Sequence, residues 1–409
     1  MNILIINHYA GSPEMGMEFR PYYFAREWIK MGHRVDIIAA DYSHLRRINP
    51  GVENDFQEDM IDDIHYHWIK TGQYEGNGAK RAMTMARFVS KLWCNTKRII
   101  KEISPDVVIC SSTYPLDTYV GQRIRKKSKK KVKLIHEVHD MWPISPIEIG
   151  GMSPKHPFIR VMQMGENSFC KNSDVVVSLL PAAKNYFMEH GMSPHKFVHI
   201  PNGVLLEEWD KPVSHIPDNI SKHFKENREK GKFNLCFFGS IHKTYNLDVL
   251  IEAVIKMNRN DLAVTFIGPG LDKEELKNMV VGHEDMFEFF DAIPKSSIPD
   301  LFNYIDASFV GAKSQNIFRF GICMNKLFDS MMGGKPILYM VDAPNNYVHD
   351  YKCGISVEGQ TDNDLQKAIE DILALSVNEK EQMGENGIKA AKEVFNYTSL
   401  AEAFINIMK

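Results

Sequence analysis

Two successive series of short apolar segments, rich in β-branched residues and separated by longer amphipathic segments, run through most of this chain. Such alternation is typical of parallel sheets that are covered by helices on both faces. The first series predicts strands at residues 3–6, 35–39, 106–111, 133–138, 174–179 and 197–200. The second series predicts strands at residues 234–238, 263–267, 286–290, 307–310, 336–340 and 355–358. The pattern therefore indicates two doubly wound α/β domains.

The segments between and after these strands define the domain organisation. Helices are predicted at residues 19–30, 80–102, 116–127, 158–171, 247–257, 273–280, 326–332 and 363–374. A polar stretch at residues 205–232 is interpreted as the interdomain linker, and after Ser376 the chain is purely helical (378–394 and 399–408). Packing back across the first domain would bury the apolar face of the last helix. We therefore predict two facing Rossmann-like domains, residues 1–204 and 205–385, with residues 386–409 crossing back to the first.

Composition excludes several classes of protein. A length of 409 residues exceeds one ordinary hydrophobic core, and a net charge of −3 argues against a nucleic acid as the main partner. The six cysteines form no CxxC pair, which indicates neither a disulfide framework nor a zinc site and fits a reducing cytosol. The first residues lack the features of a signal peptide, and no apolar run reaches the roughly 18 residues that a membrane span needs. We expect a cytoplasmic protein.

Ligands of doubly wound sheets bind at the carboxyl ends of the strands, so the loops there carry the candidate chemistry. The loop after the first strand and the start of the next helix supply His8, Gly16, Glu18 and Arg20. A glycine-bearing turn of this kind can present N–H groups to an anion, or it can be a tight turn without a ligand. It is not GxGxxG, and no acidic residue closes the second strand, so a nicotinamide cofactor is not indicated.

The sequence EVHDMWP follows the strand predicted at residues 133–138 and places His139 and Asp140 at the same edge. Ionisable groups there can hold a sugar and stabilise positive charge at a reacting carbon. The alternative interpretation is a helix cap next to a structural tryptophan. We favour the functional interpretation because two ionisable neighbours lie at the edge where ligands bind.

Two segments of the second domain indicate a phosphate site. Gly239, Ser240 and Lys243 follow its first strand, where N–H donors and one cation suit a diphosphate. The helix predicted from Asn325 to Met332 ends at a double glycine, and its N-terminus can point at phosphate. Asp329 lies one turn after Asn325, where a carboxylate could accept hydrogen bonds from both ribose hydroxyls.

These motifs together resemble a known family. The stretch from Gly16 to Pro50, EVHDMWP, IPNGV, FFGSIHK, FRFGICMNKLFDSMMGGKPIL and the closing MGENG…FNYTSLAEAF are similar to retaining GT-B glycosyltransferases of the family 4 type. The likeness covers nearly the whole chain and is greatest to bacterial enzymes of O-antigen and capsule synthesis, such as fucosamine transferases. It implies transfer of a hexosyl or N-acetylhexosaminyl group from a nucleotide sugar, a UDP-sugar above all, to a glycan or polyprenyl-diphosphate-linked acceptor.

The resemblance also implies roles for individual residues. Asp329 matches the second acid of the family's Glu-x7-Glu signature, whereas Gly321 stands where the first acid is expected. Ser240 and Tyr245 stand where the family usually has an arginine and a lysine for the diphosphate. Lys243, Arg319 or Lys326 are therefore the candidates for that charge. His139 or Asp140 matches the position near the donor sugar, and Ile293 matches the position that contacts the base through its backbone.

A metal cofactor is not expected, because Asp362 and Asp364 form the only Asp-x-Asp motif and open a predicted helix as a cap. The basic run from Arg123 to Lys133 is interpreted either as a solvated helix end or as a surface that attracts anionic lipid, on the inner face of the plasma membrane. Two other functions stay open: a sugar-nucleotide 2-epimerase of similar twin-domain fold, or a nucleotide-sugar-binding protein without activity.

Overall fold

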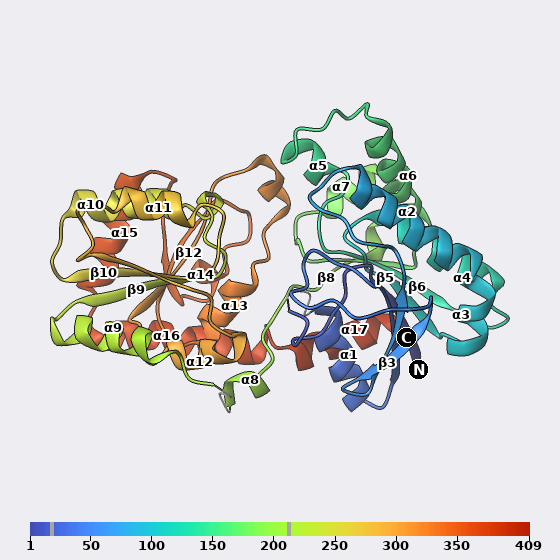
Figure 1. Cartoon of the computed structure of the whole chain (residues 1–409), viewed down its shortest axis with the longest axis horizontal. Helices are drawn as coiled ribbons and strands as arrows, with labels where there is room; N and C mark the ends of the chain where they lie inside the picture. Colours follow the sequence, from blue (N-terminus) through green and yellow to red (C-terminus); the bar gives the residue numbers. More distant parts are fainter. Residues whose placement is uncertain (17–19, 211–213) are drawn as a thin grey trace. The chain divides into compact units, whose positions relative to one another are not determined.

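The computed structural model describes residues 1–16, 20–210 and 214–409 (Figure 1). The chain divides into two compact units, Met1–Pro201 with Tyr397–Lys409, and Asn202–Asn396. Each unit is built on one sheet, of eight strands in the first and six in the second. The predicted class, two Rossmann-like α/β domains with parallel sheets, is confirmed.

The sheet of the first unit has the order β3-β4-β2-β1-β5-β6-β7-β8, and only the β3–β4 pair is antiparallel. Six of its strands agree with the predicted ones to within one or two residues at each end. Two strands were not predicted, because β3 is a polar edge strand and β4 carries two histidines within its apolar run. The strands are β1 (Asn2–Ile6), β2 (Arg34–Ala40), β3 (Gln57–Ile61), β4 (Ile64–Ile69), β5 (Val107–Cys110), β6 (Lys133–Val138), β7 (Val175–Ser178) and β8 (Phe197–His199).

The helices of the first unit pack their apolar sides on this sheet. The segment predicted as one helix at 80–102 is two helices, because Asn95 ends the first and begins the second. Buried residues of β1, β5 and β6 pack with those of the two helices and of α4 in one core. The helices are α1 (Arg20–Lys30), α2 (Ala79–Cys94), α3 (Thr96–Ile103), η1 (Pro115–Asp117), α4 (Thr118–Lys127), α5 (Ile144–Glu148), α6 (Pro157–Asn172), α7 (Lys184–Glu189) and η2 (Pro194–Lys196).

The sheet of the second unit has the order β11-β10-β9-β12-β13-β14 and is parallel throughout. All six strands were predicted. They are β9 (Phe233–Phe238), β10 (Leu262–Ile267), β11 (Phe287–Phe290), β12 (Ala307–Ala312), β13 (Ile337–Val341) and β14 (Gly354–Ser356). The helices of this unit are α8 (Glu207–Asp210), α9 (Asp218–Glu229), η3 (Lys243–Tyr245), α10 (Leu247–Met257), α11 (Lys273–Met279), η4 (Lys295–Ser297), α12 (Ile298–Leu301), η5 (Asn316–Phe320), α13 (Asn325–Met332), α14 (Tyr347–Asp350), α15 (Asp362–Ala374) and α16 (Val377–Glu393).

The interpretation of residues 205–232 as a linker is wrong. This segment contains α8 and α9, and α9 packs on the second sheet. Ile220 and Phe224 of α9 are buried against Cys236 and Phe238 of β9. The helix looked like a linker because its exposed face is strongly charged, while only a few apolar residues mark the buried face.

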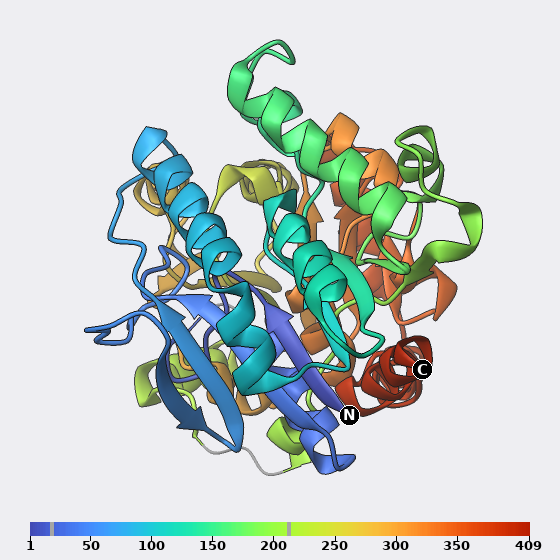
Figure 2. The same cartoon turned by 90° about the vertical axis from the view of Figure 1, so that its right-hand side faces the viewer.

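The last helix, α17 (Tyr397–Met408), packs on α1 of the first unit, as predicted (Figure 2). The indole N–H of Trp28 donates to the carbonyl of Ala401 over 3.2 Å, and the ring of Phe404 lies 5.2 Å from that of Trp28. The crossing begins at Tyr397 and not at residue 386, because α16 packs against α13 of the second unit. A Cβ on Gly384 of α16 would lie 2.1 Å from the carbonyl oxygen of Gly334, so the two backbones meet there.

Candidate active site

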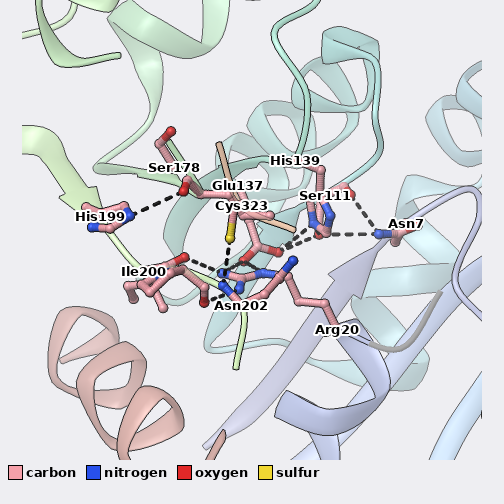
Figure 3. A network of polar contacts seen from close by, with 12 residues as sticks. Asn7, Arg20, Ser111, Glu137, His139, Ser178, His199, Ile200, Asn202 and Cys323 are labelled. Carbon is pink, nitrogen blue, oxygen red and sulfur yellow. Dashed lines mark hydrogen bonds and ion pairs between the residues drawn. The ribbon is translucent and has the colours of Figure 1, made fainter. Parts of the chain in front are cut away.

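Three adjacent strands of the first sheet, β1, β5 and β6, bring polar residues together where they end (Figure 3). Asn7 follows β1, Ser111 follows β5, and Glu137 is the next-to-last residue of β6. The amide of Asn7 donates to the carbonyl of Ser111 over 2.7 Å, and the Ser111 hydroxyl donates to Oε2 of Glu137 over 2.7 Å. Sequence reasoning assigned no role to Asn7 or Ser111, although Asn7 directly follows one predicted strand and Ser111 is the last residue of another.

Glu137 is the centre of this network and forms a buried ion pair with Arg20 of α1. Nε of Arg20 lies 3.0 Å from Oε1 of Glu137, and both side chains are 4% exposed. Arg20 also donates to the carbonyls of Ile200 (2.9 Å) and Pro201 (2.6 Å), after β8. Burial alone would raise the pKa of Glu137, but the charges of Arg20 and His139 and the hydrogen bonds from His139 and Ser111 hold this pKa well below its usual range. Glu137 is therefore an anion with a fixed position.

His139 is held by the same carboxylate. Its Nε2 lies 3.0 Å from Oε2 of Glu137 and 2.8 Å from the Ser111 hydroxyl, and its side chain is 12% exposed. Because Glu137 is ionised, it accepts a hydrogen bond from the Nε2–H group of His139, which fixes the orientation of the ring. An imidazole fixed in this way can interact with charge that develops on a bound substrate without first having to reorient.

Asp140 is placed differently from His139, because its carboxylate is engaged within its own loop. Its Oδ1 accepts hydrogen bonds from the Met141 N–H (2.8 Å) and the Ser145 hydroxyl, and its Oδ2 accepts one from the indole N–H of Trp142 (3.1 Å). Both carboxylate oxygens are thus used by the loop that leads into α5. The bond to Trp142 agrees with the structural tryptophan of the alternative interpretation, whereas α5 follows Pro143 without a side-chain cap.

The other candidates of the first unit lie apart from the Glu137 network or outside the described residues. His8 is fully buried, its Nδ1 lies 2.7 Å from the Tyr114 hydroxyl, and its ring packs on Phe88. Burial lowers the pKa of His8 well below its usual value, so this side chain is neutral. Gly16 has φ +75° in the turn before α1. Glu18 lies outside the described residues. Arg20 is therefore the candidate from this part of the sequence that the described residues place in the network.

In the second unit, the loops that follow β9 and β10 approach each other backbone to backbone. Gly239 has φ +123° and Gly268 has φ +149°, and a Cβ on Gly268 would lie 1.8 Å from the carbonyl oxygen of Gly239. A Cβ on Gly270 would lie equally close to the carbonyl oxygen of Ile241. Glycines are therefore required at this edge, which keeps the backbone open to a ligand.

Lys326, in the first turn of α13, approaches the same loop. A Cβ on Gly239 would lie 3.3 Å from its Nζ. This nitrogen is buried and has no hydrogen-bond partner among the described residues. It lies 4.0 Å from the centroid of the Phe237 ring and 3.8 Å from that of Tyr245. Burial lowers the pKa of Lys326 to about 7.

Asp329 lies one turn further along α13 and is buried. Its nearest cation is Lys295 of η4, whose Nζ is 3.7 Å from Oδ1. Burial raises the pKa of Asp329, and the charge of Lys295 opposes this shift. Lys295 was not predicted, because its position in sequence carries no motif. Gly321 stands in place of the family's first acid and has φ +105°. The side chain of Asn345 accepts a hydrogen bond from the N–H of the next residue, Ile322, and donates one to its carbonyl.

The remaining donor-site candidates lie at this edge of the second sheet, with different surroundings. Lys243 is exposed and forms an ion pair with Glu275, so its charge is already compensated. Ser240 and Asn325 are exposed, and Ile293 packs partly buried after β11. Arg319 lines a hollow of about 290 Å³ between the ends of β12 and β13.

The side chains that could hold a metal ion lie apart from the donor-site candidates of the second unit. In the described part of the chain, Cys110, Asp117 and His136 bring one potential ligand atom each within 4.8 Å of one another, in the buried core of the first unit. Asp364 forms a capping box with Thr361 at the start of α15, and Asp362 pairs with Lys256. The expected cap is therefore formed by Thr361 with Asp364.

Comparison with known proteins agrees with this architecture. Residues 15–208 match the profile of Glycosyltransferase Family 4, and residues 218–390 match that of Glycosyl transferases group 1. An uncharacterized glycosyltransferase of Methanocaldococcus jannaschii is 25% identical over 336 residues, which are 79% of each chain. The chain is a glycosyltransferase of the GT-B type, with the family 4/group 1 fold.

Solved structures share the fold at low sequence identity. Sucrose-phosphate synthase of Thermosynechococcus elongatus superimposes with a TM-score of 0.74 at 14% identity, covering 100% of this chain and 98% of the other. HepE of Anabaena, solved in complex with UDP and glucose, superimposes with a TM-score of 0.66 at 16% identity, covering 99% and 98%. These similarities concern the fold.

Proposed function

We propose that this protein is a retaining glycosyltransferase that moves a hexosyl or N-acetylhexosaminyl group from a UDP-sugar to a glycan or polyprenyl-diphosphate-linked acceptor. Surface polysaccharide synthesis, as in O-antigen or capsule assembly, is the process that this acceptor class suits. The observation that carries the proposal is the imidazole of His139, which Glu137 and Ser111 fix at the carboxyl edge of the first sheet. The neighbour solved with UDP and glucose supports the choice of donor.

We propose that residues of the first unit contact the transferred sugar and that residues of the second unit bind the nucleotide. In glycosyl transfer the bond from the anomeric carbon to the diphosphate breaks, negative charge grows on the leaving oxygen and positive charge grows on the sugar. We propose that His139 contacts the transferred sugar. Together with the Glu137 carboxylate behind it, the imidazole would stabilise the positive charge on the sugar. Gly239, Ser240, Lys326 and the N-terminus of α13 would bind the diphosphate, Asp329 the ribose, and the backbone at Ile293 the base.

The test is incubation of the protein with a panel of sugar nucleotides, with and without a lipid-linked acceptor, in the presence of EDTA. We expect sugar transfer only when the acceptor is present, and no dependence of the rate on added Mg²⁺ or Mn²⁺. NMR of the product should show the same anomeric configuration as in the donor. An epimerised donor would instead identify a sugar-nucleotide 2-epimerase. Binding without turnover across the panel would identify an inactive binding protein, and an inverted product would contradict retention.

Asp329→Ala is expected to weaken UDP binding by about 10- to 100-fold, since a hydrogen bond to a charged group contributes about 1.5–3 kcal/mol. Removing a buried carboxylate also leaves Lys295 without its 3.7 Å partner, so the melting temperature is measured in parallel. Calorimetry with UDP gives the affinity. An Asp329→Ala variant that is folded and binds UDP as the wild type does would exclude the ribose role.

The basic run is expected to bind anionic membranes. Lys126, Lys127, Lys129 and Lys131 are exposed after and within the end of α4, whereas Lys130 pairs with Asp106. Replacing the four exposed lysines by serine should lower binding to anionic vesicles more than tenfold, at about 1 kcal/mol for each basic residue. The control replaces four lysines that are exposed on other helices or directly after one, Lys230, Lys367, Lys389 and Lys392. No described helix is long and apolar enough to cross a bilayer.

Co-sedimentation with vesicles at low and high salt measures this effect, since screening over about 8–10 Å weakens surface attraction at physiological ionic strength. Turnover of a short soluble acceptor should be unchanged in both variants. Equal vesicle binding of the two variants would show that the run is only a solvated helix end.

A further inference from the structure

The amine of Lys326 is a polar group that the fold buries without satisfying. Its Nζ has no hydrogen-bond partner among the described residues, and two aromatic faces lie within 4.0 Å of it. An isolated buried cation is costly, and contact with aromatic rings offsets only a part, about 0.5–2 kcal/mol. The burial of Nζ between Phe237 and Tyr245 is therefore a feature that a ligand should explain.

The charged groups on the neighbouring elements are paired with one another and not with Lys326. On and beside η3, Nδ1 of His242 lies 3.2 Å from Asp272, and Lys243 pairs with Glu275. On α13 itself, Asp329 pairs with Lys295 of η4. The Tyr245 hydroxyl has a pKa raised by burial, so this ring stays neutral. Burial is the single cause that lowers the pKa of Lys326 to about 7, so near neutral pH a large share of this amine is uncharged.

The groups around Nζ define the ligand that would satisfy it. The amine borders Gly239, whose loop is open because a Cβ there would crowd Nζ at 3.3 Å. It also lies in the first turn of an eight-residue helix, where N–H groups favour an anion. We propose that Lys326 is the buried cation of the diphosphate site and that it takes up a proton from solvent when a nucleoside diphosphate binds. This inference rests on the proposed function and adds to it the source of the charge.

The position of the amine also accounts for two departures from the family pattern. The resemblance places the diphosphate-binding arginine and lysine at Ser240 and Tyr245, and neither residue is a cation here. Nζ of Lys326 lies over the ring of Tyr245, so a lysine from α13 brings its amine to the position where the family lysine is missing. Lys243, the other nearby lysine, is exposed and already paired.

The proposal predicts that UDP binding takes up protons from solvent, and this uptake can be measured. At pH 8.5 UDP is fully ionised, because phosphate second ionisations lie near pH 6. Free Lys326 is then mostly neutral, and the bound diphosphate stabilises the ammonium form, so binding consumes one proton. Calorimetry of UDP binding in two buffers with different ionisation enthalpies should give an uptake approaching one proton at pH 8.5. The Kd should rise with pH above about 7, by up to tenfold for each pH unit.

Substitution of Lys326 should move binding and stability in opposite directions. Lys326→Met removes an unsatisfied buried amine, so we expect a higher melting temperature, together with UDP affinity lowered about 10- to 100-fold and no proton uptake. Lys367→Met removes an exposed lysine from α15 of the same unit and should change none of these quantities. Lys326→Arg keeps a permanent charge, so any UDP binding it retains should proceed without proton uptake.

Three results overturn the inference. They are wild-type uptake near zero at pH 8.5, UDP affinity unchanged in a folded Lys326→Met variant, and an equal loss in Lys367→Met. Failure of the proposed function is distinguishable: without a nucleotide-sugar site the wild type would bind neither UDP nor GDP at any pH, whereas an epimerase or an inactive binding protein would bind UDP but transfer no sugar to an acceptor. UDP binding that is tight but indifferent to Lys326 removes only the role of this residue.

Discussion

His139→Ala should lower kcat about 10²- to 10³-fold while leaving the Kd for UDP nearly unchanged, since this is the usual effect of removing one positioned group that stabilises developing charge. The imidazole is held by Ser111 at 2.8 Å and by Glu137 at 3.0 Å, so it loses no freedom when the transition state forms. The residues proposed to bind the nucleotide lie on the second sheet, so UDP affinity should be insensitive to the change. Single-turnover rates and UDP calorimetry measure the two quantities.

Asp140→Ala is the matched control, because it removes the next side chain along the chain. Its carboxylate accepts hydrogen bonds from Met141 and Trp142, so we expect a loss of about 1–3 kcal/mol of stability from these bonds and a smaller change in kcat than for His139→Ala. Ser111→Ala should have an intermediate effect on kcat, since His139 keeps Glu137 as its partner. A folded His139→Ala variant with normal kcat, or equal kcat losses in His139→Ala and Asp140→Ala, would refute direct contact with the sugar.

Glu137→Ala is expected to cost about 3–5 kcal/mol of unfolding free energy, because it leaves the charge of Arg20 buried and uncompensated. Both side chains are only 4% exposed, so water replaces little of the lost interaction. Replacing both residues by methionine should recover part of the loss, since the uncompensated charge is removed. Recovery stays incomplete because Arg20 also satisfies the carbonyls of Ile200 and Pro201. Urea unfolding of the full-length variants at pH 7 gives these values.

The carboxylate of Glu137 also makes the free energy of unfolding depend on pH, in a direction that its pKa determines. The pKa of Glu137 in the folded protein lies below its ordinary value of 4.5, so the unfolded chain binds the proton first as the pH falls. The stability that Glu137 contributes is therefore fully present above pH 4.5 and is lost as the pH falls below it. The difference in stability between the wild type and Glu137→Gln should shrink between pH 5 and pH 3. A difference that stays constant over this range would show that Glu137 is not an ion-paired anion.

The sequence alone predicted the α/β class and nearly all strands of both sheets. Local periodicity carries this information, because a buried parallel strand must be apolar along its whole length and its covering helices must be amphipathic. It failed for β3 and β4, whose polar and histidine-containing residues hide the strand pattern, and for α9, whose few buried residues stand among charged ones. Residues that directly follow strands, such as His139 and Gly239, could be identified for the same reason.

Only the tertiary structure decided which of those residues act together. Arg20 and Glu137 are 117 residues apart and meet because the side chain of Arg20, the first residue of α1, reaches the end of β6 and the carbonyls after β8. The sequence left Lys243, Arg319 and Lys326 equivalent as sources of positive charge, and their surroundings separated them: Lys243 is exposed and paired, whereas Nζ of Lys326 is buried between two rings. Residue type and spacing determine what a side chain can do. Its burial and its partners, which set its charge, depend on strand order and on contacts between distant segments.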